Sequence, residues 1–313
     1  ALMKTKETID AILAETGNGV LGKDDVVRRI LTAILAGGHI LIDDIPGVGK
    51  TTMAVAFTRT LGLDYKRMQF TPDVLPSDIT GFSMYDKASG SFRYVACSAM
   101  TNFFLADELN RASPKTQSAL LEVMQEGRLS VDGKTYTVPQ PFIVMATQNP
   151  FGSSGTQELP ESQTDRFMIR ITVGYPSREN EIEILKGSRR SAALSLSAVI
   201  TPDDLLQLRK QAAEVHVEDS LFAYMVDIAA ATRESHDISL GISPRGTMAL
   251  SAMTRAHALM EGRAYATPDD VLAVAPYTLS HSITLSGDAR FAGKTAASVL
   301  DDILKSVPMP ELV

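Results

Sequence analysis

The chain has 313 residues, 44% of them hydrophobic, so it can bury a substantial core, and its length suggests about two domains. Thirty Lys and Arg against 37 Asp and Glu give a net charge of −7, which argues against a strongly basic binder of nucleic-acid backbones. The single Cys97 excludes an internal disulfide, and no apolar run reaches the ~18 residues that span a bilayer, so we expect a cytoplasmic protein without membrane insertion.

The first half of the chain alternates short apolar runs with helical patterns, as a parallel sheet with crossover helices requires. Buried strands are expected at 39–42 (HILI), 102–108 (NFFLADE) and 142–149 (FIVMATQN). Polar residues follow each apolar run, and open parallel sheets place their ligands at the carboxyl ends of their strands. The sequence therefore predicts an α/β fold whose functional site lies at that edge.

A phosphate-binding loop is predicted directly after the first of these strands. Segment 43–52 (DDIPGVGKTT) contains the GK[ST] that closes such loops, but Asp44 stands where the pattern GxxxxGK[ST] has its first glycine. A helical pattern follows and ends at Gly62, so the loop has the strand and helix context that a true phosphate loop needs. The alternative is a plain glycine-rich turn.

The positions of this loop have distinct expected roles. Backbone N–H groups at the start of the helix would face the β-phosphate, Lys50 would neutralise the β- and γ-phosphates, and the Thr51 hydroxyl would hold Mg²⁺. Asp44 matters little to this geometry, because the phosphate approaches the later part of the loop and a Pro-Gly pair supplies the turn. The expected nucleotide-binding residues are Pro46, Gly47, Val48, Gly49, Lys50, Thr51 and Thr52.

Two β-hairpins are expected to interrupt the α/β pattern, at 82–95 and 128–138. The first turns around residues 89–91 (SGS) and the second at residues 132–133 (Asp-Gly). A helix at 114–126 precedes the second hairpin, with a Ser cap, a Pro at its first position and a Gly past its end. Exposed loops on a rigid scaffold often carry partner contacts, and simple decoration is an equal alternative.

Acidic and amide side chains end the second and third expected strands. Asp107 and Glu108 follow buried apolar residues, where two carboxylates are costly unless they are used. The pair matches a Mg²⁺-binding acid followed by a base that activates water, and an acidic capping turn is the alternative. Asn149 would position the same water or touch the γ-phosphate, although an Asn before Pro150 is often a turn residue.

Helical patterns without a convincing set of strands run from 176 to 313, so we expect a core domain at 1–175 and a smaller all-helical domain at 176–313. TPDD occurs twice, at Thr201 and Thr267, and is interpreted as convergent helix capping. The five histidines lack the spacing of metal ligands and are expected to be structural or exposed.

Two arginines complete the candidate site. Arg245 falls in the first turn of a helix that starts at Ser243, where a cation opposes the helix dipole and so suggests a nearby anion. Arg166 has Asp165 beside it as a surface partner and is unremarkable by itself.

The set of motifs resembles the MoxR branch of the AAA+ ATPases. Between about Val20 and Gly246 the resemblance is carried by GHILIDDIPGVGKT, QFTPDVLPSDITG, FFLADELNRASPKTQSALLEVMQEG, PFIVMATQNP, LPESQTDRF, GYPSR and SPRG. In that family the position of Asp44 is commonly acidic, so the departure from the loop pattern supports the resemblance. The resemblance implies an AAA+ αβα P-loop NTPase core with a parallel sheet and inserted hairpins, a small helical lid, ATP between them, and usually a hexameric ring.

The resemblance also implies roles for individual residues. Asn149 matches sensor 1, Arg245 matches sensor 2 of the lid, and Arg166 matches an arginine finger that reaches into the site of a neighbouring subunit. Gln69 lies where related proteins place a polar relay to the catalytic Glu. The segment VLGK resembles the adenine-side contact, with Val20 and Gly22 as its expected binding residues.

The implied function is Mg²⁺-dependent ATP hydrolysis that drives a chaperone-like remodeller of client proteins, assisted by a von Willebrand factor A domain partner. The alternatives are a magnesium chelatase-like subunit and a nucleotide-gated regulatory scaffold with little turnover. DNA translocation is least favoured, and no nucleic-acid partner is expected, because the chain is acidic and lacks a basic tract studded with aromatic residues.

Overall fold

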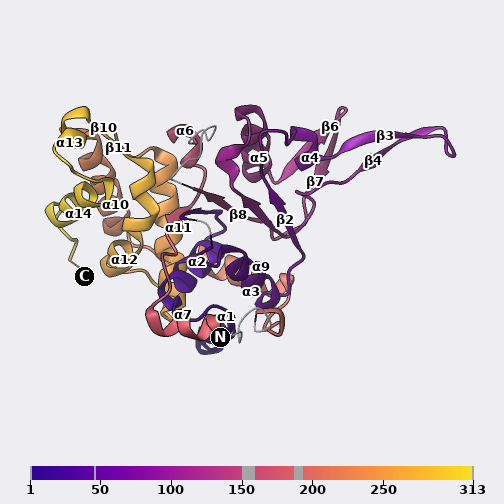
Figure 1. The fold of residues 1–313 in the computed structure, drawn as a ribbon. Helices are drawn as coiled ribbons and strands as arrows, with labels where there is room; N and C mark the ends of the chain where they lie inside the picture. Colours follow the sequence, from indigo (N-terminus) through magenta and orange to yellow (C-terminus); the bar gives the residue numbers. More distant parts are fainter. Residues whose placement is uncertain (1, 46, 150–158, 187–192, 312–313) are drawn as a thin grey trace.

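A five-stranded parallel sheet forms the centre of the protein. The computed structural model describes residues 2–45, 47–149, 159–186 and 193–311 (Figure 1). The strand order is β2-β5-β8-β1-β9, and all neighbours are parallel. The strands are β1 (Ile40–Asp43), β2 (Tyr65–Gln69), β5 (Phe103–Asp107), β8 (Ile143–Gln148) and β9 (Ile169–Ile171). The three strands predicted from sequence are thus the three central ones, which is why their apolar runs are the clearest.

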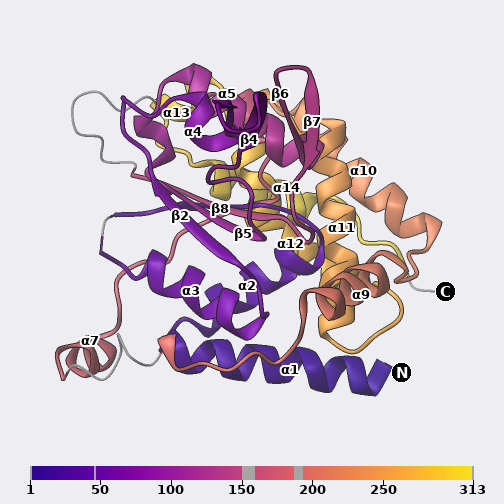
Figure 2. The same ribbon diagram turned by 90° about the vertical axis from the view of Figure 1, so that its right-hand side faces the viewer.

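Helices cover both faces of the sheet (Figure 2). Alternate strand residues point to opposite faces: Phe103 and Leu105 pack with α1 (Leu2–Gly19), α2 (Asp24–Leu35) and α3 (Lys50–Thr60). Phe104 and Ala106 pack with α4 (Pro76–Thr80) and α5 (Pro114–Glu126) on the other face. This is the predicted αβα core.

Local signals set the ends of α5 as predicted. The Ser113 hydroxyl accepts a hydrogen bond from the Thr116 amide, Pro114 is the first helical residue, and Gly127 follows the helix in the left-handed region at φ 64°. The chain then enters the hairpin of β6 (Arg128–Val131) and β7 (Lys134–Thr137), which turns at residues 132–133 with φ of 47° and 76°. Positive φ at both positions is the geometry that Asp-Gly favours.

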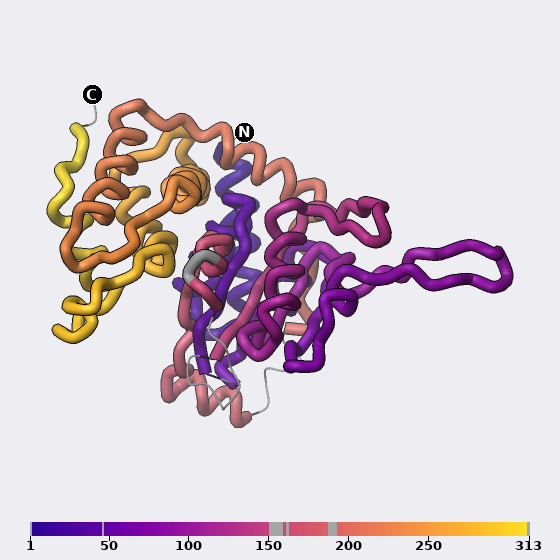
Figure 3. Tube along the Cα trace, turned by 90° about the horizontal axis from the view of Figure 1, so that it is seen from above, coloured from indigo at the N-terminus to yellow at the C-terminus, as the bar shows by residue number. Residues whose placement is uncertain are grey.

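The other predicted hairpin pairs β3 (Phe82–Asp86) with β4 (Ser91–Val95) and projects from the body of the protein (Figures 1 and 3). The Tyr85 and Phe92 rings contact each other edge to face at 5.4 Å, yet their residues are 52% and 70% exposed. Tyr94 stacks on Tyr136 of β7 at 4.0 Å, so the two hairpins are in contact.

The second half of the chain is helical, with one exception. Its elements are α7 (Arg178–Leu185), α9 (Pro202–Ala213), α10 (Asp219–Glu234), α11 (Pro244–Met260), α12 (Pro268–Leu279), α13 (Gly287–Phe291) and α14 (Ala296–Ser306). The expectation of no strands is wrong, because β10 (Ile238–Leu240) pairs with β11 (Thr284–Leu285). Strands of three and two residues are too short to show a period-two pattern.

Both TPDD segments cap helices as predicted. Thr201 and Asp204 form a reciprocal capping box at the start of α9, and Thr267 and Asp270 form one at the start of α12. Helices α9 and α11 pack on α2, and the sheet and the helical half share one hydrophobic cluster. Within the described ranges, no helix is both long and apolar enough to cross a membrane.

Candidate nucleotide-binding site

The loop between β1 and α3 has a backbone that only glycine adopts without strain. Gly47 and Gly49 have φ of 88° and 93°, and Gly49 directly precedes Lys50, the first residue of α3. A Cβ atom at either glycine would point into open space. The predicted Pro46 lies outside the described residues. The loop therefore presents bare backbone at a helix N-terminus, which is a site for phosphate.

A cavity of about 420 Å³ opens beside this loop. It is lined by Gly19, Val20, Leu21, Lys23, Gly47, Val48, Gly49, Thr52, Pro176 and Ile184. The predicted residues among them are Val20, Val48, Thr52 and the two loop glycines, whereas the predicted Gly22 is not part of the lining. Sequence reasoning missed Pro176 and Ile184, whose segment lies far along the chain. Apolar side chains next to a phosphate loop suit the flat base of a nucleotide.

Asp44, the residue that breaks the loop pattern, is a buried structural anchor. Its residue is 8% exposed, and Oδ2 accepts hydrogen bonds from the amides of Val173 (2.7 Å) and Gly174 (2.6 Å). Its Oδ1 accepts from the Ile45 amide at 2.8 Å, and its backbone carbonyl accepts from Lys50 Nζ at 2.9 Å. A glycine at this position would have none of the three side-chain bonds.

The acids predicted at the end of β5 lie near the loop lysine. Partial burial lowers the pKa of Lys50, and the charges of Asp107, Asp44 and Glu108 oppose that shift. Thr147 of β8 joins the two predicted acids, since its Oγ1 donates to Asp107 Oδ1 at 2.7 Å and accepts from the Glu108 amide at 2.9 Å. The structure thus gathers the lysine and both acids at the carboxyl edge of the sheet.

Glu108 is held in a strained conformation. Its φ of 57° lies in the left-handed region, which costs a residue with a side chain about 1–3 kcal/mol and is concentrated at functional sites. Its Oε2 accepts from Arg111 Nη1 at 2.9 Å and from Gln69 Nε2 at 3.4 Å. The hydrogen bond from Gln69 to the Glu108 carboxylate is the contact expected of the polar relay that the resemblance implies for Gln69. Sequence reasoning missed Arg111, and it missed Thr147 although the neighbouring Asn149 was singled out.

Asp107 and Asn149 are each fixed by a side chain from another element. Asp107 Oδ2 accepts from Arg67 Nη2 on β2 at 2.7 Å. The backbone N–H of Asn149 donates to Asn110 Oδ1 at 3.4 Å, and Asn110 Nδ2 donates to the backbone carbonyl of Asn149 at 3.2 Å. Asn149 follows β8, the strand next to β1, so it lies at the same edge as the phosphate loop.

Neither predicted arginine is hydrogen-bonded or ion-paired to the phosphate loop within the described residues. Asp165, which follows α6 (Glu161–Thr164), accepts from the hydroxyls of Ser243 at 2.8 Å and Ser282 at 2.7 Å. In the described part of the chain no ion pair joins Asp165 to Arg166, so the surface pairing considered from sequence is wrong: the carboxylate is committed to the serines. Arg166 Nε is buried without a hydrogen-bond partner there, and Arg245 is exposed in the first turn of α11. Ser243 caps that helix, so Asp165 brings both arginines to one region of the surface.

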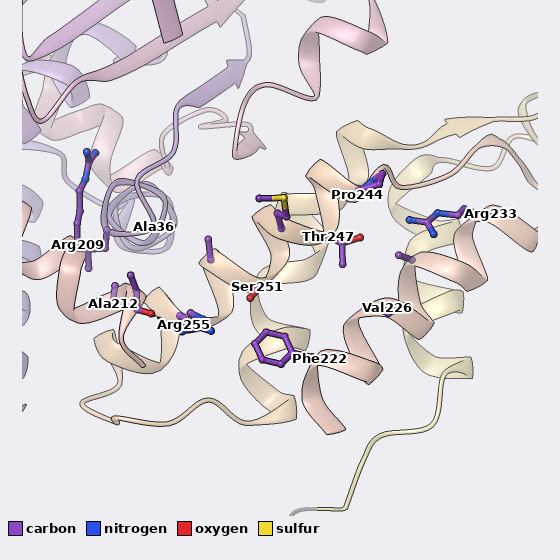
Figure 4. A pocket seen from close by; sticks show the side chains of 15 residues that line it. Ala36, Arg209, Ala212, Phe222, Val226, Arg233, Pro244, Thr247, Ser251 and Arg255 are labelled. Atoms are coloured by element: carbon purple, nitrogen blue, oxygen red, sulfur yellow. Dashed lines mark hydrogen bonds between the residues drawn. The ribbon is translucent and has the colours of Figure 1, made fainter. Parts of the chain in front are cut away.

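A larger cavity of about 610 Å³ lies between α9, α10 and α11 (Figure 4). Phe222 of α10 and Ser251 of α11 lie on its walls, together with three arginines. Arg209, Arg233 and Arg255 each donate to a backbone carbonyl, of Ile34, Ile242 and Ala213 respectively. The lining contains neither a phosphate loop nor an acid. The smaller cavity is therefore the better candidate for a nucleotide site.

The donor set beside the loop fits Mg²⁺ bound together with a phosphate. Thr51 offers a hydroxyl and Asp107 a carboxylate, and both are the hard oxygen ligands that Mg²⁺ prefers. Within the described ranges, no group of three or more His, Cys, Asp or Glu residues is arranged to hold a metal ion. A magnesium ion here would therefore depend on phosphate oxygens and water for its remaining ligands, as is usual at nucleotide sites.

Comparisons with known proteins identify the family of the chain. Residues 39–169 match the ATPase family associated with various cellular activities (AAA), and residues 230–303 match an AAA lid domain. The uncharacterized protein YeaC of Bacillus subtilis is 44% identical, over 93% of this chain and 91% of its own length. Chaperone MoxR1 of Mycobacterium tuberculosis is 38% identical, over 97% of this chain and 83% of its own.

Structural similarity extends over the whole chain. The crystal structure of a candidate ATPase from Cytophaga hutchinsonii has a TM-score of 0.91 and 34% identity, and the match covers 99% of this chain and 97% of that one. The match to the AAA family includes the phosphate loop of this chain, and the match to the lid domain lies in its helical half. The chain belongs to the MoxR family of AAA+ ATPases.

Proposed function

We propose that the protein binds ATP with Mg²⁺ and hydrolyses it to ADP and phosphate. The observation that carries this proposal is the meeting of Lys50, Asp107 and Glu108 at one edge of the sheet, next to a glycine loop with open space above it. Residues that bind triphosphate, metal and water are needed at one point for phosphoryl transfer to water, and little covalent chemistry is required of the protein.

Each residue has a separate task in this proposal. The loop amides and Lys50 hold the phosphates, while Thr51 and Asp107 hold Mg²⁺, which neutralises the charge that develops on the phosphate oxygens. Glu108 accepts a proton from the water that attacks the γ-phosphorus, and the bond to the bridging oxygen breaks. Asn149 orients that water. The strained backbone of Glu108 supports its role as the base, because it fixes the direction in which the Glu108 side chain leaves the backbone.

The arginines point to a ring of identical subunits, which we propose to be a hexamer. Arg166 and Arg245 lie near the core-to-lid contacts of Asp165, and within the described residues neither makes a hydrogen bond or ion pair with its own phosphate loop. We propose that both serve the nucleotide of the neighbouring subunit. An arginine finger supplied in this way is worth ~10³ to 10⁵ in rate in well-studied systems, so an isolated subunit is expected to be a poor ATPase.

Mixing two inactive variants tests this assembly. Glu108→Gln lacks the base but donates an intact arginine, and Arg166→Ala lacks the arginine but keeps the base. Mixed at equal amounts they should regain activity, because about a quarter of interfaces pair an intact Glu108 with an intact Arg166. Wild-type activity per subunit should also rise with protein concentration. Activity that is independent of concentration, together with no recovery in the mixture, would exclude action across subunits.

We propose further that hydrolysis drives chaperone-like remodelling of a client protein, with a von Willebrand factor A domain protein as partner. The name of the relative MoxR1 supports a chaperone role. The exposed apolar side chains of Phe82, Tyr85 and Phe92 on β3–β4 support contact with a polypeptide, since such patches mark interaction sites.

Affinity capture with Glu108→Gln tests the client role, because this variant should hold ATP and keep clients bound. Adding Phe92→Ser should abolish capture while the same change in the wild type leaves ATP hydrolysis intact. Capture that is unchanged by Phe92→Ser and by omission of ATP would contradict the proposal.

A further inference from the structure

The segment 173–176 contributes one wall of the candidate nucleotide cavity through Pro176. It joins β9 to α7, and Pro176 lines the cavity together with Val20 and the glycines of the phosphate loop. No regular secondary structure holds this segment in place. Its position therefore depends on the side chains that bind its backbone.

Two oppositely charged side chains bind neighbouring backbone groups of this wall. The Asp44 carboxylate accepts from the amides of Val173 and Gly174. The Lys23 ammonium donates to the carbonyls of Val173 (2.7 Å), Gly174 (3.2 Å) and Tyr175 (2.8 Å). Hydrogen bonds to ionised groups are stronger than neutral ones, and here the anion takes the N–H groups while the cation takes the C=O groups. A rotation of this segment would break its hydrogen bonds to both side chains.

We infer that Asp44 and Lys23 are positioning residues that hold segment 173–176 as the base-side wall of the nucleotide cavity. The inference rests on the proposed function, because it assumes that ATP binds there. It explains the acid in the loop: the first glycine of the usual pattern is replaced by an anchor that ties the wall to the loop itself. Lys50 Nζ donates to the Asp44 carbonyl, so the same residue also contacts the phosphate-binding lysine.

The wall should matter for the base and not for the phosphates. The phosphates bind at 47–52, whereas Pro176 and Ile184 belong to the apolar side of the cavity. Loosening the wall therefore removes contacts to adenine and leaves the phosphate cradle intact. Mg-ATP and inorganic Mg-tripolyphosphate distinguish these two parts of the site, since only ATP carries a base.

Titration calorimetry of Asp44→Gly and Lys23→Met with both ligands tests the inference. We expect the Kd for ATP to rise about tenfold in each variant, as for a contact segment that must be ordered on binding, while the Kd for tripolyphosphate changes less than about twofold. Lys6→Met removes a lysine that pairs with Asp10 on the exposed face of α1, and it serves as the control that should change neither.

The possible failures differ in meaning. Equal weakening of both ligands, or no weakening of ATP, would overturn the positioning role while leaving ATP binding in place. A wild-type protein that binds neither ligand would overturn the proposed function, and the positioning role with it.

Hydrogen exchange tests the anchor without any ligand. The amides of Val173 and Gly174 should exchange at least about tenfold faster in Asp44→Gly than in the wild type, because their acceptor is lost. Asp44→Asn, which keeps one carbonyl oxygen, should be intermediate in both exchange and ATP affinity. Identical exchange in Asp44→Gly and wild type would refute the anchor.

Discussion

Replacing Thr147 by valine should slow hydrolysis without weakening ATP binding. Thr147 is fully buried, and its hydroxyl bridges the Glu108 amide at 2.9 Å and Asp107 Oδ1 at 2.7 Å. Valine has nearly the same shape but offers neither bond. An unsatisfied buried amide costs about 1–3 kcal/mol, which is comparable to the cost of the left-handed conformation that the bond helps to hold at Glu108.

The strained backbone of Glu108 can then relax, and its carboxylate moves. A displacement of about 1 Å at a catalytic group can cost about 10²-fold in rate, so we expect kcat to fall roughly 10- to 100-fold in Thr147→Val. The Kd for ATP should stay within about twofold, because the loop glycines and Lys50 are untouched.

Phosphate release at saturating ATP gives kcat, and calorimetry gives the Kd. Thr147→Ser restores the hydroxyl and should recover most of kcat. Thr254→Val removes another buried threonine, whose hydroxyl donates to the Leu250 carbonyl within α11, and should leave kcat unchanged. If Thr147→Val were destabilised by the expected amount yet turned over ATP at the wild-type rate, the bridge would have no role in placing Glu108.

Two further predictions concern ligand-linked and pH-dependent stability. At 100 times its Kd, ATP should stabilise the wild type by ~2.7 kcal/mol in thermal unfolding but should not stabilise Lys50→Ala. The exposed control Lys115→Ala should respond to ATP like the wild type. An equal ATP-dependent stabilisation of Lys50→Ala would count against the phosphate loop. Burial would raise the pKa of Asp270, but hydrogen bonds from His257, Arg263 and the Thr267 backbone outweigh it and hold the pKa well below its usual range. Asp270→Asn should therefore lower the free energy of unfolding by about 3 kcal/mol near neutral pH, because it leaves Arg263 without its buried partner. This difference in stability from the wild type should shrink as the pH falls below about 4, where the carboxyl of the unfolded chain becomes protonated. The exposed neighbour Asp269→Asn is the control in urea unfolding, and a difference that grows in acid would contradict the assignment.

The features predicted correctly from the sequence are those whose information is local. Ser113 caps its helix through an amide three residues away, and the Asp-Gly pair at 132–133 makes its own turn. The central strands were predicted because each is buried on both faces and reads as one apolar run. The positions of the phosphate loop and of the acid pair were predicted for the same reason, since each is a short pattern at a strand end.

The features that were missed depend on partners far along the chain. Lys23 binds carbonyls about 150 residues later, and Asp44 binds amides about 130 residues later, so neither role appears in any sequence window. Thr147 meets the acids only because β8 lies beside β5 in the sheet. The β10–β11 pair was missed for another reason, because five residues in two strands are too few to show an alternation of apolar and polar side chains.

Helix α5 connects the turn that follows Glu108 to the two hairpins. The buried Gln117 amide donates to the carbonyls of Leu109 and Ala112, which fixes the start of α5 to the turn that directly follows Glu108. The other end of α5 continues into β6, and Tyr136 stacks on Tyr94 of the projecting hairpin. The exposed rings of the projecting hairpin are therefore joined to the turn that follows Glu108 through a continuous series of packed elements.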